Sequence, residues 1–407
     1  MKRPLPFHYA WLIALCGALT LFCCFGLARF SFGMLLPAMR ADLGFGYDRM
    51  GFVSTGNFVG YLISVGLAPL VLRWVKPRLL VSLALALIAL ALLGISQSSS
   101  FVVIVGLYAL VGVGGGFANI PIMVLVSHWF RRERRGRAAG LMVAGNGVGI
   151  ILSGFLIPWL NDVLGADGWR AGWLILGGLI LLLALVVGLL LRNDPADLGL
   201  EPVGRLQAPR EAELIPREAP GTGRVLAQLG LLYAIFGATY LIYGTFIVTT
   251  LVEEYGFGEG TAGMFWSWVG FFSIFSGVGF GALSDHIGRK WGLMAVFILQ
   301  TAAYGLAGSN FGPWAMFASV VLYGLGMFAI PTIMAAAVGD YLGLSRAAAA
   351  FSLLTFCFAI GQTLGPSGAG MLGQALGGFA PAYLLSAAST ALAALLTSLL
   401  PKPAEPH

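Results

Sequence analysis

The chain has 407 residues, of which 58% are hydrophobic and 10% are charged, and its mean hydropathy is +0.90. A soluble domain has about 25% charged residues, so this composition excludes an ordinary soluble protein and predicts one that faces lipid. The net charge of +6 does not indicate a nucleic-acid partner, because so few charges cannot form a basic groove.

Twelve apolar stretches are long enough to cross a bilayer as helices, which takes roughly 20 residues. In chain order they cover 10–36, 50–72, 79–97, 101–129, 138–160, 172–191, 226–251, 262–284, 291–308, 313–339, 347–372 and 381–400. The basic N-terminus enters the first stretch without a small-residue cleavage site, which predicts a retained span rather than a signal peptide. The four cysteines lie inside apolar stretches and have neither disulfide nor metal spacing.

Lys and Arg are distributed unequally between the two sides of this predicted topology. An even number of spans puts both termini on one side of the membrane. If that side is cytoplasmic, 19 Lys and Arg residues lie inside and three lie outside, namely Arg40, Arg49 and Arg170. The positive-inside rule therefore predicts cytoplasmic N- and C-termini.

A long polar segment and an internal repeat divide the chain into two halves. Residues 192–224 are rich in Pro, Gly and mixed charge, which predicts a flexible linker at 196–222 between bundles 1–195 and 223–407. GFGYDRMG at 44–51 matches GFGEGTAG at 256–263, and the prolines of ANIPIM (118–123) and FAIPTI (328–333) lie 210 positions apart. We therefore expect an all-α membrane protein of two pseudo-symmetric six-helix bundles.

The segment GALSDHIGRK (281–290) resembles the loop signature of the major facilitator superfamily, G-x-x-x-D-R-x-G-R-R/K, with His286 in place of the first Arg. The resemblance implies alternating access around a site between the two halves. It also implies gating roles for Asp285 and Arg289, with Asp285 docking near the start of span five, where Arg137 lies. The alternative is that Asp285 and Arg289 only cap and anchor the loop.

The corresponding loop after span two, APLVLRWVKPR (68–78), departs from the signature. Leu72 stands where the acid belongs, and only the basic residues Arg73, Lys76 and Arg78 remain. This departure argues against a symmetric inner gate.

Two further segments are similar to the monocarboxylate-porter and oxalate/formate-antiporter side of the superfamily. They are LARFSFGMLLPAMRADLGFGYDRMG in and after the first span, and RNDPADLGL after the sixth. The resemblance implies small carboxylates as substrates. It extends to related bacterial transporters, so we expect the bacterial cytoplasmic membrane as the location.

Arg29 is the single charge that this topology places inside the membrane, since all 17 acidic residues lie in loops or at span ends. A charge at depth costs several kcal/mol unless it is paired, hydrated or snorkelled to the interface. Asn57 lies at a similar depth in the returning second span. Arg29 either anchors an anionic substrate or snorkels outward. We favour the anchor, because no acid partner is present and the first span lines the cavity in this family.

Five other polar residues inside predicted spans are candidate substrate contacts beside Arg29 and Asn57. They are Asn119, Asn146, Tyr240, Tyr243 and Gln362. In the superfamily, spans one, four, seven and ten line the cavity, so Asn119 and Tyr243 rank highest after Arg29. For Asn57, Asn146 and Gln362, hydrogen bonding between helices is an equal alternative.

The sequence therefore predicts a transporter and not an enzyme. No phosphate-binding G-x-x-x-x-G-K-S/T motif and no Cys/His cluster is present, so we expect neither cofactor nor metal. We expect a monomeric secondary active or facilitative transporter of a small organic anion, a monocarboxylate, with a co-transported proton as one option; symport, antiport and uniport all fit. The alternatives are an exporter of amphipathic or aromatic compounds and a non-transporting membrane sensor.

Overall fold

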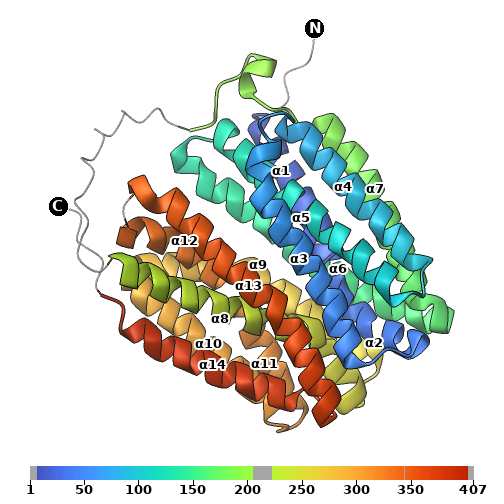
Figure 1. Cartoon of the computed structure of the whole chain (residues 1–407). Coiled ribbons are helices and arrows are strands. Elements are labelled where there is room, and N and C mark those ends of the chain that lie inside the picture. Colours follow the sequence, from blue (N-terminus) through green and yellow to red (C-terminus); the bar gives the residue numbers. More distant parts are fainter. Residues whose placement is uncertain (1–6, 205–221, 343, 402–407) are drawn as a thin grey trace. The chain divides into compact units, whose positions relative to one another are not determined.

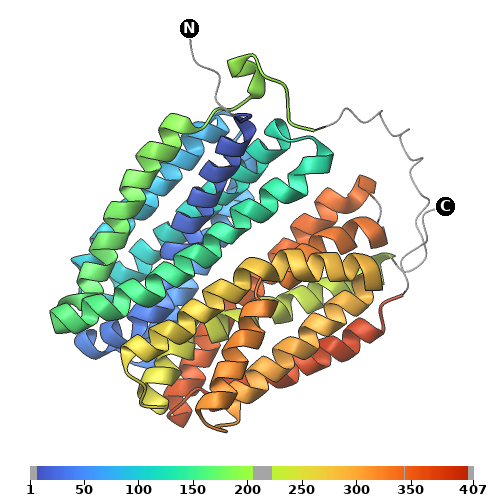
Figure 2. The same ribbon diagram turned by 180° about the vertical axis from the view of Figure 1, so that it is seen from behind.

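The computed structural model describes residues 7–204, 222–342 and 344–401, which are almost entirely helical (Figure 1). The chain forms two compact units. Unit 1 comprises Met1–Leu43 with Gly56–Ala208, and unit 2 comprises Gly44–Thr55 with Pro209–His407. Figure 2 shows the same helices from behind. The first turns of the helix that begins at Tyr47 thus belong to unit 2, although the rest of that helix belongs to unit 1.

Unit 1 contains the helices of the first half of the chain. They are α1 (Ala10–Leu21), the π-helix η1 (Phe22–Leu27), α2 (Ser31–Leu43), most of α3 (Tyr47–Val71), α4 (Pro77–Ser96), α5 (Phe101–Trp129), α6 (Arg132–Leu164), the 3-10 helix η2 (Gly165–Asp167), α7 (Gly168–Leu190) and the 3-10 helix η3 (Pro195–Leu198). The side chains of Trp129, Trp169 and Trp173 are fully buried, so large aromatic rings fill the interior of this unit.

Unit 2 contains the remaining helices. They are α8 (Thr222–Thr249), the π-helix η4 (Thr250–Glu254), α9 (Glu259–Ile287), α10 (Arg289–Gly308), α11 (Pro313–Gly326), α12 (Ala329–Leu342), α13 (Leu344–Leu376) and α14 (Ala380–Ser398). Its interior is also aromatic, with Tyr243, Tyr304, Tyr323 and Tyr383 fully buried.

The described residues contain ten stretches that are long and apolar enough to cross a membrane. One of them, Glu133–Leu190, has 58 residues and includes both α6 and α7, which are separate helices. The 33-residue α13 covers the predicted span 347–372. These helices are consistent with the twelve predicted spans, and they show that the protein is an integral membrane protein.

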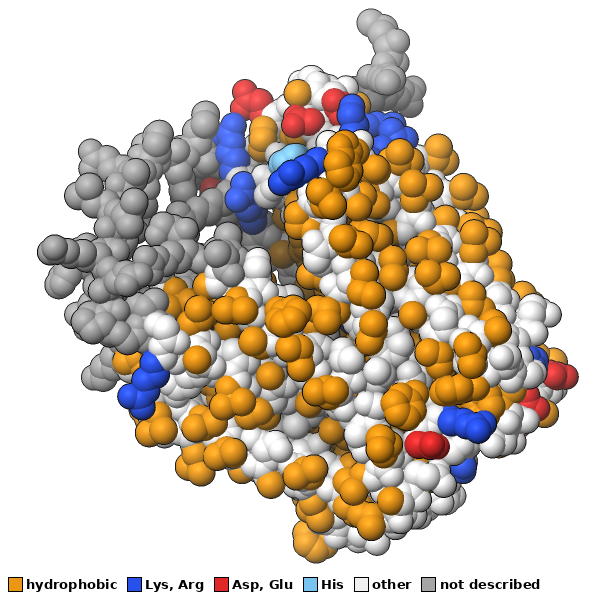
Figure 3. All heavy atoms as spheres, viewed as in Figure 1, with side chains coloured by type: hydrophobic (Ala, Val, Ile, Leu, Met, Phe, Trp, Pro, Cys, Tyr) orange, Lys and Arg blue, Asp and Glu red, His pale blue; other side chains and the backbone are white. Residues whose placement is uncertain are grey.

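The outer faces of the helices are apolar, as lipid contact requires. On α7 the exposed side chains of Leu182, Leu185 and Leu189 form one stripe at helical spacing, with 58–69% of each accessible. Figure 3 shows hydrophobic side chains spread over the visible face, while charged side chains lie toward its edges.

Two predicted spans are interrupted helices. The tenth is divided into α11 and α12, and Pro331 lies in the first turn of α12, where its missing N–H removes no bond within that helix. The freed N–H of Phe328 donates to Ser276 Oγ at 3.0 Å. The first is divided by η1 and a turn at residues 28–30, directly at Arg29.

The first residues of the predicted linker 196–222 are described, and its boundaries stay a prediction. Residues up to 204 pack against unit 1: Val203 pairs with Phe130, and Arg131 forms a 2.9 Å ion pair with Glu201. Asp194 caps η3, which gives this stretch a defined turn. Most of the predicted linker 196–222 lies outside the described residues.

Candidate functional site

Arg29 lies in the interruption of the first span, between η1 and α2, and only 8% of it is exposed. In η1 the backbone N–H of Ala28 donates to the carbonyl of Cys23, which is the five-residue spacing of a π-turn. Such turns are frequent at functional sites. Gly26 and Gly149 allow η1 and α6 to approach closely, because a Cβ at either would overlap the other's backbone.

The Arg29 guanidinium is held by one amide and three aromatic rings. Its Nε donates to Asn57 Oδ1 at 3.1 Å. Its Cζ lies 4.5 Å from the ring centres of Phe25 and Tyr61 and 5.0 Å from that of Phe58. These five residues, which we call the Arg29 site, stabilise a buried cation by hydrogen bonding and by cation–π attraction.

Further hydrogen bonds fix the orientation of the site. Asn57 Nδ2 donates to the carbonyl of Tyr108 at 3.1 Å, and the Tyr108 hydroxyl donates to the carbonyl of Arg29 at 3.0 Å. Asn119 Nδ2 donates to the Tyr61 hydroxyl at 3.2 Å. The carbonyl freed by the helix interruption is therefore satisfied by Tyr108, and Asn119 reaches the site through Tyr61.

The packing of α3 against α5 depends on glycine. A Cβ at Gly112 would overlap the carbonyl oxygen of Asn57, and one at Gly60 would overlap that of Ala109. These contacts bring the backbone that carries Asn57 directly against α5, which places its amide beside Tyr108.

One edge of the guanidinium is unpaired. Arg29 Nη2 is buried and has no hydrogen-bond partner, and Arg29 forms no ion pair with any residue that the structure describes. On that side, a Cβ at Gly115 would lie 3.8 Å from Nη2, in ordinary contact, so the glycine leaves space beside it. A buried cation with a free donor can bind an anion.

The predicted site residues of unit 2 form a separate network. Gln362 Nε2 donates to the Tyr240 hydroxyl at 2.9 Å, and the Tyr323 hydroxyl donates to the Tyr240 carbonyl at 2.7 Å. The hydroxyls of Tyr243 and Ser319 are 2.7 Å apart. The rings of Tyr243 and Tyr323 stack with centres 4.1 Å apart. The polar groups of these residues thus bond to one another inside the unit.

Asn146 lies on α6, one turn before the glycine that packs against η1. Its side chain is buried, and its Oδ1 has no partner among the described atoms. Hydrogen bonding between helices, the alternative for this residue, is therefore not seen for that atom.

The predicted gating residues are Asp285, Arg289 and Arg137. Arg289 forms an ion pair with Asp285, and its Nε donates to Asp340 Oδ2 at 2.7 Å. Its Nη1 donates to Ser284 Oγ at 2.7 Å. Arg137 is exposed on α6. The loop anchoring is present within unit 2, and the gating role stays a prediction.

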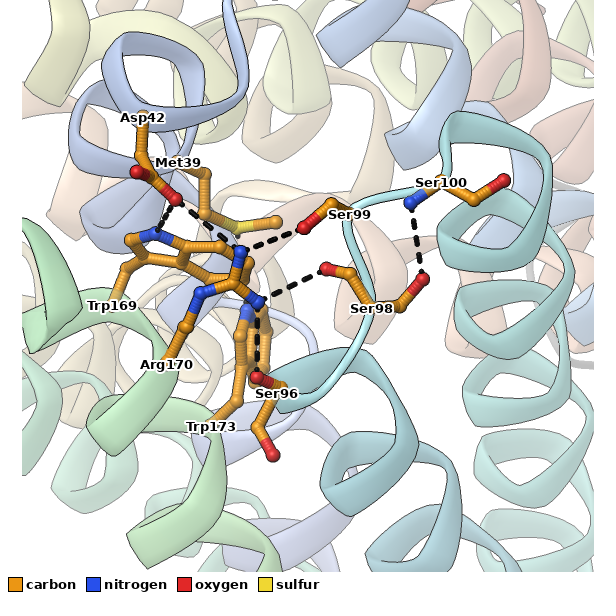
Figure 4. Close-up of polar contacts among 9 residues, drawn as sticks. All are labelled: Met39, Asp42, Ser96, Ser98, Ser99, Ser100, Trp169, Arg170 and Trp173. Carbon is orange, nitrogen blue, oxygen red and sulfur yellow. Dashed lines mark hydrogen bonds and ion pairs between the residues drawn. The ribbon is translucent and has the colours of Figure 1, made fainter.

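A second polar cluster of unit 1 surrounds Arg170, at the start of α7, which joins three segments of that unit (Figure 4). Its guanidinium donates to the carbonyls of Ser96 and Ser98, to Ser99 Oγ and to Asp42 Oδ2, over 2.9–3.4 Å. Trp169 Nε1 donates to the same carboxylate oxygen at 3.0 Å. The cluster ties the end of α2 and the α4–α5 turn to α7.

Sequence reasoning missed the aromatic residues of the Arg29 site. Phe25 precedes Arg29 by four residues and Tyr61 follows Asn57 by four, so helical spacing is a signal that could have found both. Tyr108 has no such signal, since it comes from α5. Among the described residues, no group of three or more His, Cys, Asp or Glu could hold a metal ion.

The helical bundles and the cation buried inside one of them define a multispanning membrane protein with the features of a solute carrier. A family model described as "Uncharacterised MFS-type transporter YbfB" matches residues 21–398. The chain belongs to this family of MFS-type transporters, which confirms the resemblance to the major facilitator superfamily.

Curated relatives match parts of the chain. The "Probable hexose phosphate transport protein" of Chlamydia pneumoniae is 28% identical over 176 residues, which are 43% of this chain and 38% of that protein. Human "Monocarboxylate transporter 11" is 27% identical over 292 residues, or 69% of this chain and 59% of that protein. The alignments thus span less than two thirds of either relative.

Solved structures match nearly the whole chain in fold. The crystal structure of a bacterial homologue of the human lysosomal transporter Spinster, inward-facing and occupied, has a TM-score of 0.78 at 16% identity and covers 98% of this chain and 97% of that one. The nucleoside transporter NupG has a TM-score of 0.74 at 14% identity, with 96% and 99% covered. At these identities the likeness shows the fold alone, and it confirms the predicted fold class.

Proposed function

We propose that this transporter moves a small organic anion, a monocarboxylate, across the bacterial cytoplasmic membrane by alternating access, with both termini cytoplasmic. The Arg29 site binds the anionic group. The protein works as a secondary active or facilitative carrier and acts as a monomer.

The observation that carries this proposal is the unpaired edge of a buried arginine. Arg29 is 8% exposed, and Nη2 has no partner, while Nε is held by Asn57. A buried cation without a counter-ion costs several kcal/mol, and cation–π contacts of about 0.5–2 kcal/mol each offset only part of that. An anionic cargo supplies the missing negative charge. It does not have to displace a protein carboxylate from Arg29 in order to bind.

The names of the relatives support an anion. Hexose phosphates and monocarboxylates both carry a negatively charged oxygen group, although the rest of the two molecules differs. We favour the monocarboxylate because the aromatic rings of Phe25, Phe58 and Tyr61 surround the cation. These rings suit a small anion with an apolar body better than a polyhydroxylated sugar phosphate.

Asn119 takes part through Tyr61, whose hydroxyl it orients. Asn57 keeps the guanidinium in place. Substrate contacts by Asn146, Tyr240, Tyr243 and Gln362 stay predictions. A proton that travels with the anion would be carried by the substrate carboxylate, since the residues around Arg29 include no acid.

Uptake of labelled carboxylates into proteoliposomes tests the proposal, with wild type, Arg29→Gln and Arg29→Lys compared. Loss of a charge-assisted hydrogen bond of about 1.5–3 kcal/mol lowers anion affinity about 10- to 100-fold in Arg29→Gln. Arg29→Lys keeps the positive charge and should retain part of the wild-type anion affinity. Arg224→Gln, which removes an exposed arginine at the start of α8, is the matched control and keeps wild-type uptake. Unimpaired uptake by Arg29→Gln removes Arg29 from the mechanism.

The three rings around Arg29 also favour a second candidate, an exporter of amphipathic or aromatic compounds in which Arg29 is structural. A thermal-shift panel separates the two functions. Stabilisation by hydrophobic compounds and by no carboxylate supports the exporter, whereas stabilisation by carboxylates that is lost in Arg29→Gln supports the anion carrier.

A further inference from the structure

The loop between α3 and α4 presents two cations and an indole to the surroundings. Arg73, Trp74 and Lys76 are exposed, with 74% of Trp74 accessible. Arg73 and Lys76 form no ion pair with any residue in the described part of the chain. We propose that this loop, residues 72–78, binds the headgroup of an anionic phospholipid.

The equivalent turn of unit 2 shows what the α3–α4 loop has lost. There the arginine of the turn, Arg289, is neutralised by Asp285 and Asp340. The neighbouring Lys290 donates to the carbonyl of Leu400 at 2.9 Å. In the α3–α4 loop the place of the acid is taken by Leu72, so the positive charge is left for an external anion.

Acids in the segment that touches this loop are already engaged. Residues 188–193 contact the loop through Arg78, whose Nε donates to the carbonyl of Gly188 at 2.8 Å. The acids that follow, Asp194 and Asp197, form the capping box of η3, with Asp194 accepting from Ala196 at 2.9 Å. Neither of them pairs with a loop cation. Figure 3 shows Lys and Arg side chains gathered at one end of unit 1, beyond the apolar face.

The loop has a fixed conformation and an apolar flank. The N–H of Trp74 donates to the carbonyl of Val71 at 3.0 Å, and Pro77 begins α4, so the turn is held at both ends. Leu70 and Leu79 beside it are 43% and 53% exposed. Acyl chains would cover these leucines, the indole would lie at the headgroup level, and the two cations would contact the phosphate.

This partner fits the proposed orientation of the protein. With cytoplasmic termini the loop lies at the cytoplasmic leaflet, whose anionic lipids attract Lys and Arg near the surface by about 1 kcal/mol each. The inference does not depend on Arg29 or on the cargo, because the loop is separate from the Arg29 site.

Native mass spectrometry of the detergent-solubilised full chain tests the proposal. The protein is titrated with dioctanoyl phosphatidylglycerol or dioctanoyl phosphatidylcholine. We expect saturable, salt-sensitive binding of phosphatidylglycerol and much weaker binding of phosphatidylcholine. Affinity should fall about fivefold in Lys76→Gln and about thirtyfold in Arg73→Gln/Lys76→Gln. Both side chains are exposed, so the variants should fold normally.

The matched control is Lys290→Gln. Lys290 also lies beside an exposed tryptophan, Trp291, but its ammonium group already donates to a carbonyl within the protein. Lys290→Gln should leave phosphatidylglycerol affinity unchanged, and the charge-preserving Arg73→Lys should also bind normally. Equal affinity of wild type and the double variant overturns the proposal. So does displacement of the lipid by millimolar inorganic phosphate, since the site would then be one for a free anion.

Discussion

Arg29 and Asn57 should be strongly coupled in energy, because the Arg29 guanidinium is buried without a counter-ion among the described residues and its Nε donates to Asn57 Oδ1. Asn57→Ala removes the 3.1 Å bond from Arg29 Nε and the 3.1 Å bond to the Tyr108 carbonyl. The charged bond contributes about 1.5–3 kcal/mol, and the neutral one about 0.6 kcal/mol, as between helices in membranes. We therefore expect Asn57→Ala to lower the free energy of unfolding by about 2–4 kcal/mol.

Arg29→Met removes the charge together with its desolvation cost, so it should change the free energy of unfolding by less than about 2 kcal/mol. In that background Asn57→Ala breaks only the neutral bond and should cost about 0.6 kcal/mol. The double-mutant cycle thus predicts a coupling of about 1.5–3 kcal/mol between the two residues.

Reversible unfolding in mixed micelles, followed by tryptophan fluorescence, measures the four free energies. Ser153→Ala serves as the control in both backgrounds, because its hydroxyl donates within α6 to the carbonyl of Ile150 at 2.9 Å. Its cost should be the same with and without Arg29. If Asn57→Ala costs the same in both backgrounds within about 0.5 kcal/mol, the hydrogen bond does not stabilise the cation and the reasoning is refuted.

Two further predictions concern packing and the tyrosines of unit 2. Gly112→Ala places a methyl group on the Asn57 carbonyl and should lower the free energy of unfolding by more than about 2 kcal/mol. The control Gly106→Ala lies on the same helix with nothing within 4 Å, and it should not lower the free energy of unfolding. Equal thermal shifts of the two variants would contradict the glycine packing. Tyr243→Phe keeps the ring stack and loses only the bond to Ser319, so it should cost about 0.5–1.5 kcal/mol in a thermal-shift measurement. A loss of transport in Tyr243→Phe with unchanged stability would place the hydroxyl at the cargo instead.

The sequence was sufficient to predict the membrane fold and to single out Arg29, the residue at the centre of the candidate site. Hydropathy is a local property, so a run of apolar residues predicts its own helix wherever the rest of the chain lies. An unpaired charge in hydrocarbon is costly wherever it lies in the chain, which is why Arg29 could be identified without a structure. Asn57 was placed at the same depth because a short turn between two spans leaves little freedom in register.

Only the tertiary structure shows which faces of the helices meet. A helix that is apolar on all sides has no stripe to indicate which face is buried, so the sequence could place Asn57 beside Arg29 in depth but not in direction. Glycines such as Gly112 settle that direction, since they let backbones approach where any Cβ would collide. The same packing brings Tyr108 of α5 to the Arg29 carbonyl and Asn119 to Tyr61. The sequence alone thus determined the membrane fold and the buried cation, and helix packing determined how that cation is held with one edge free.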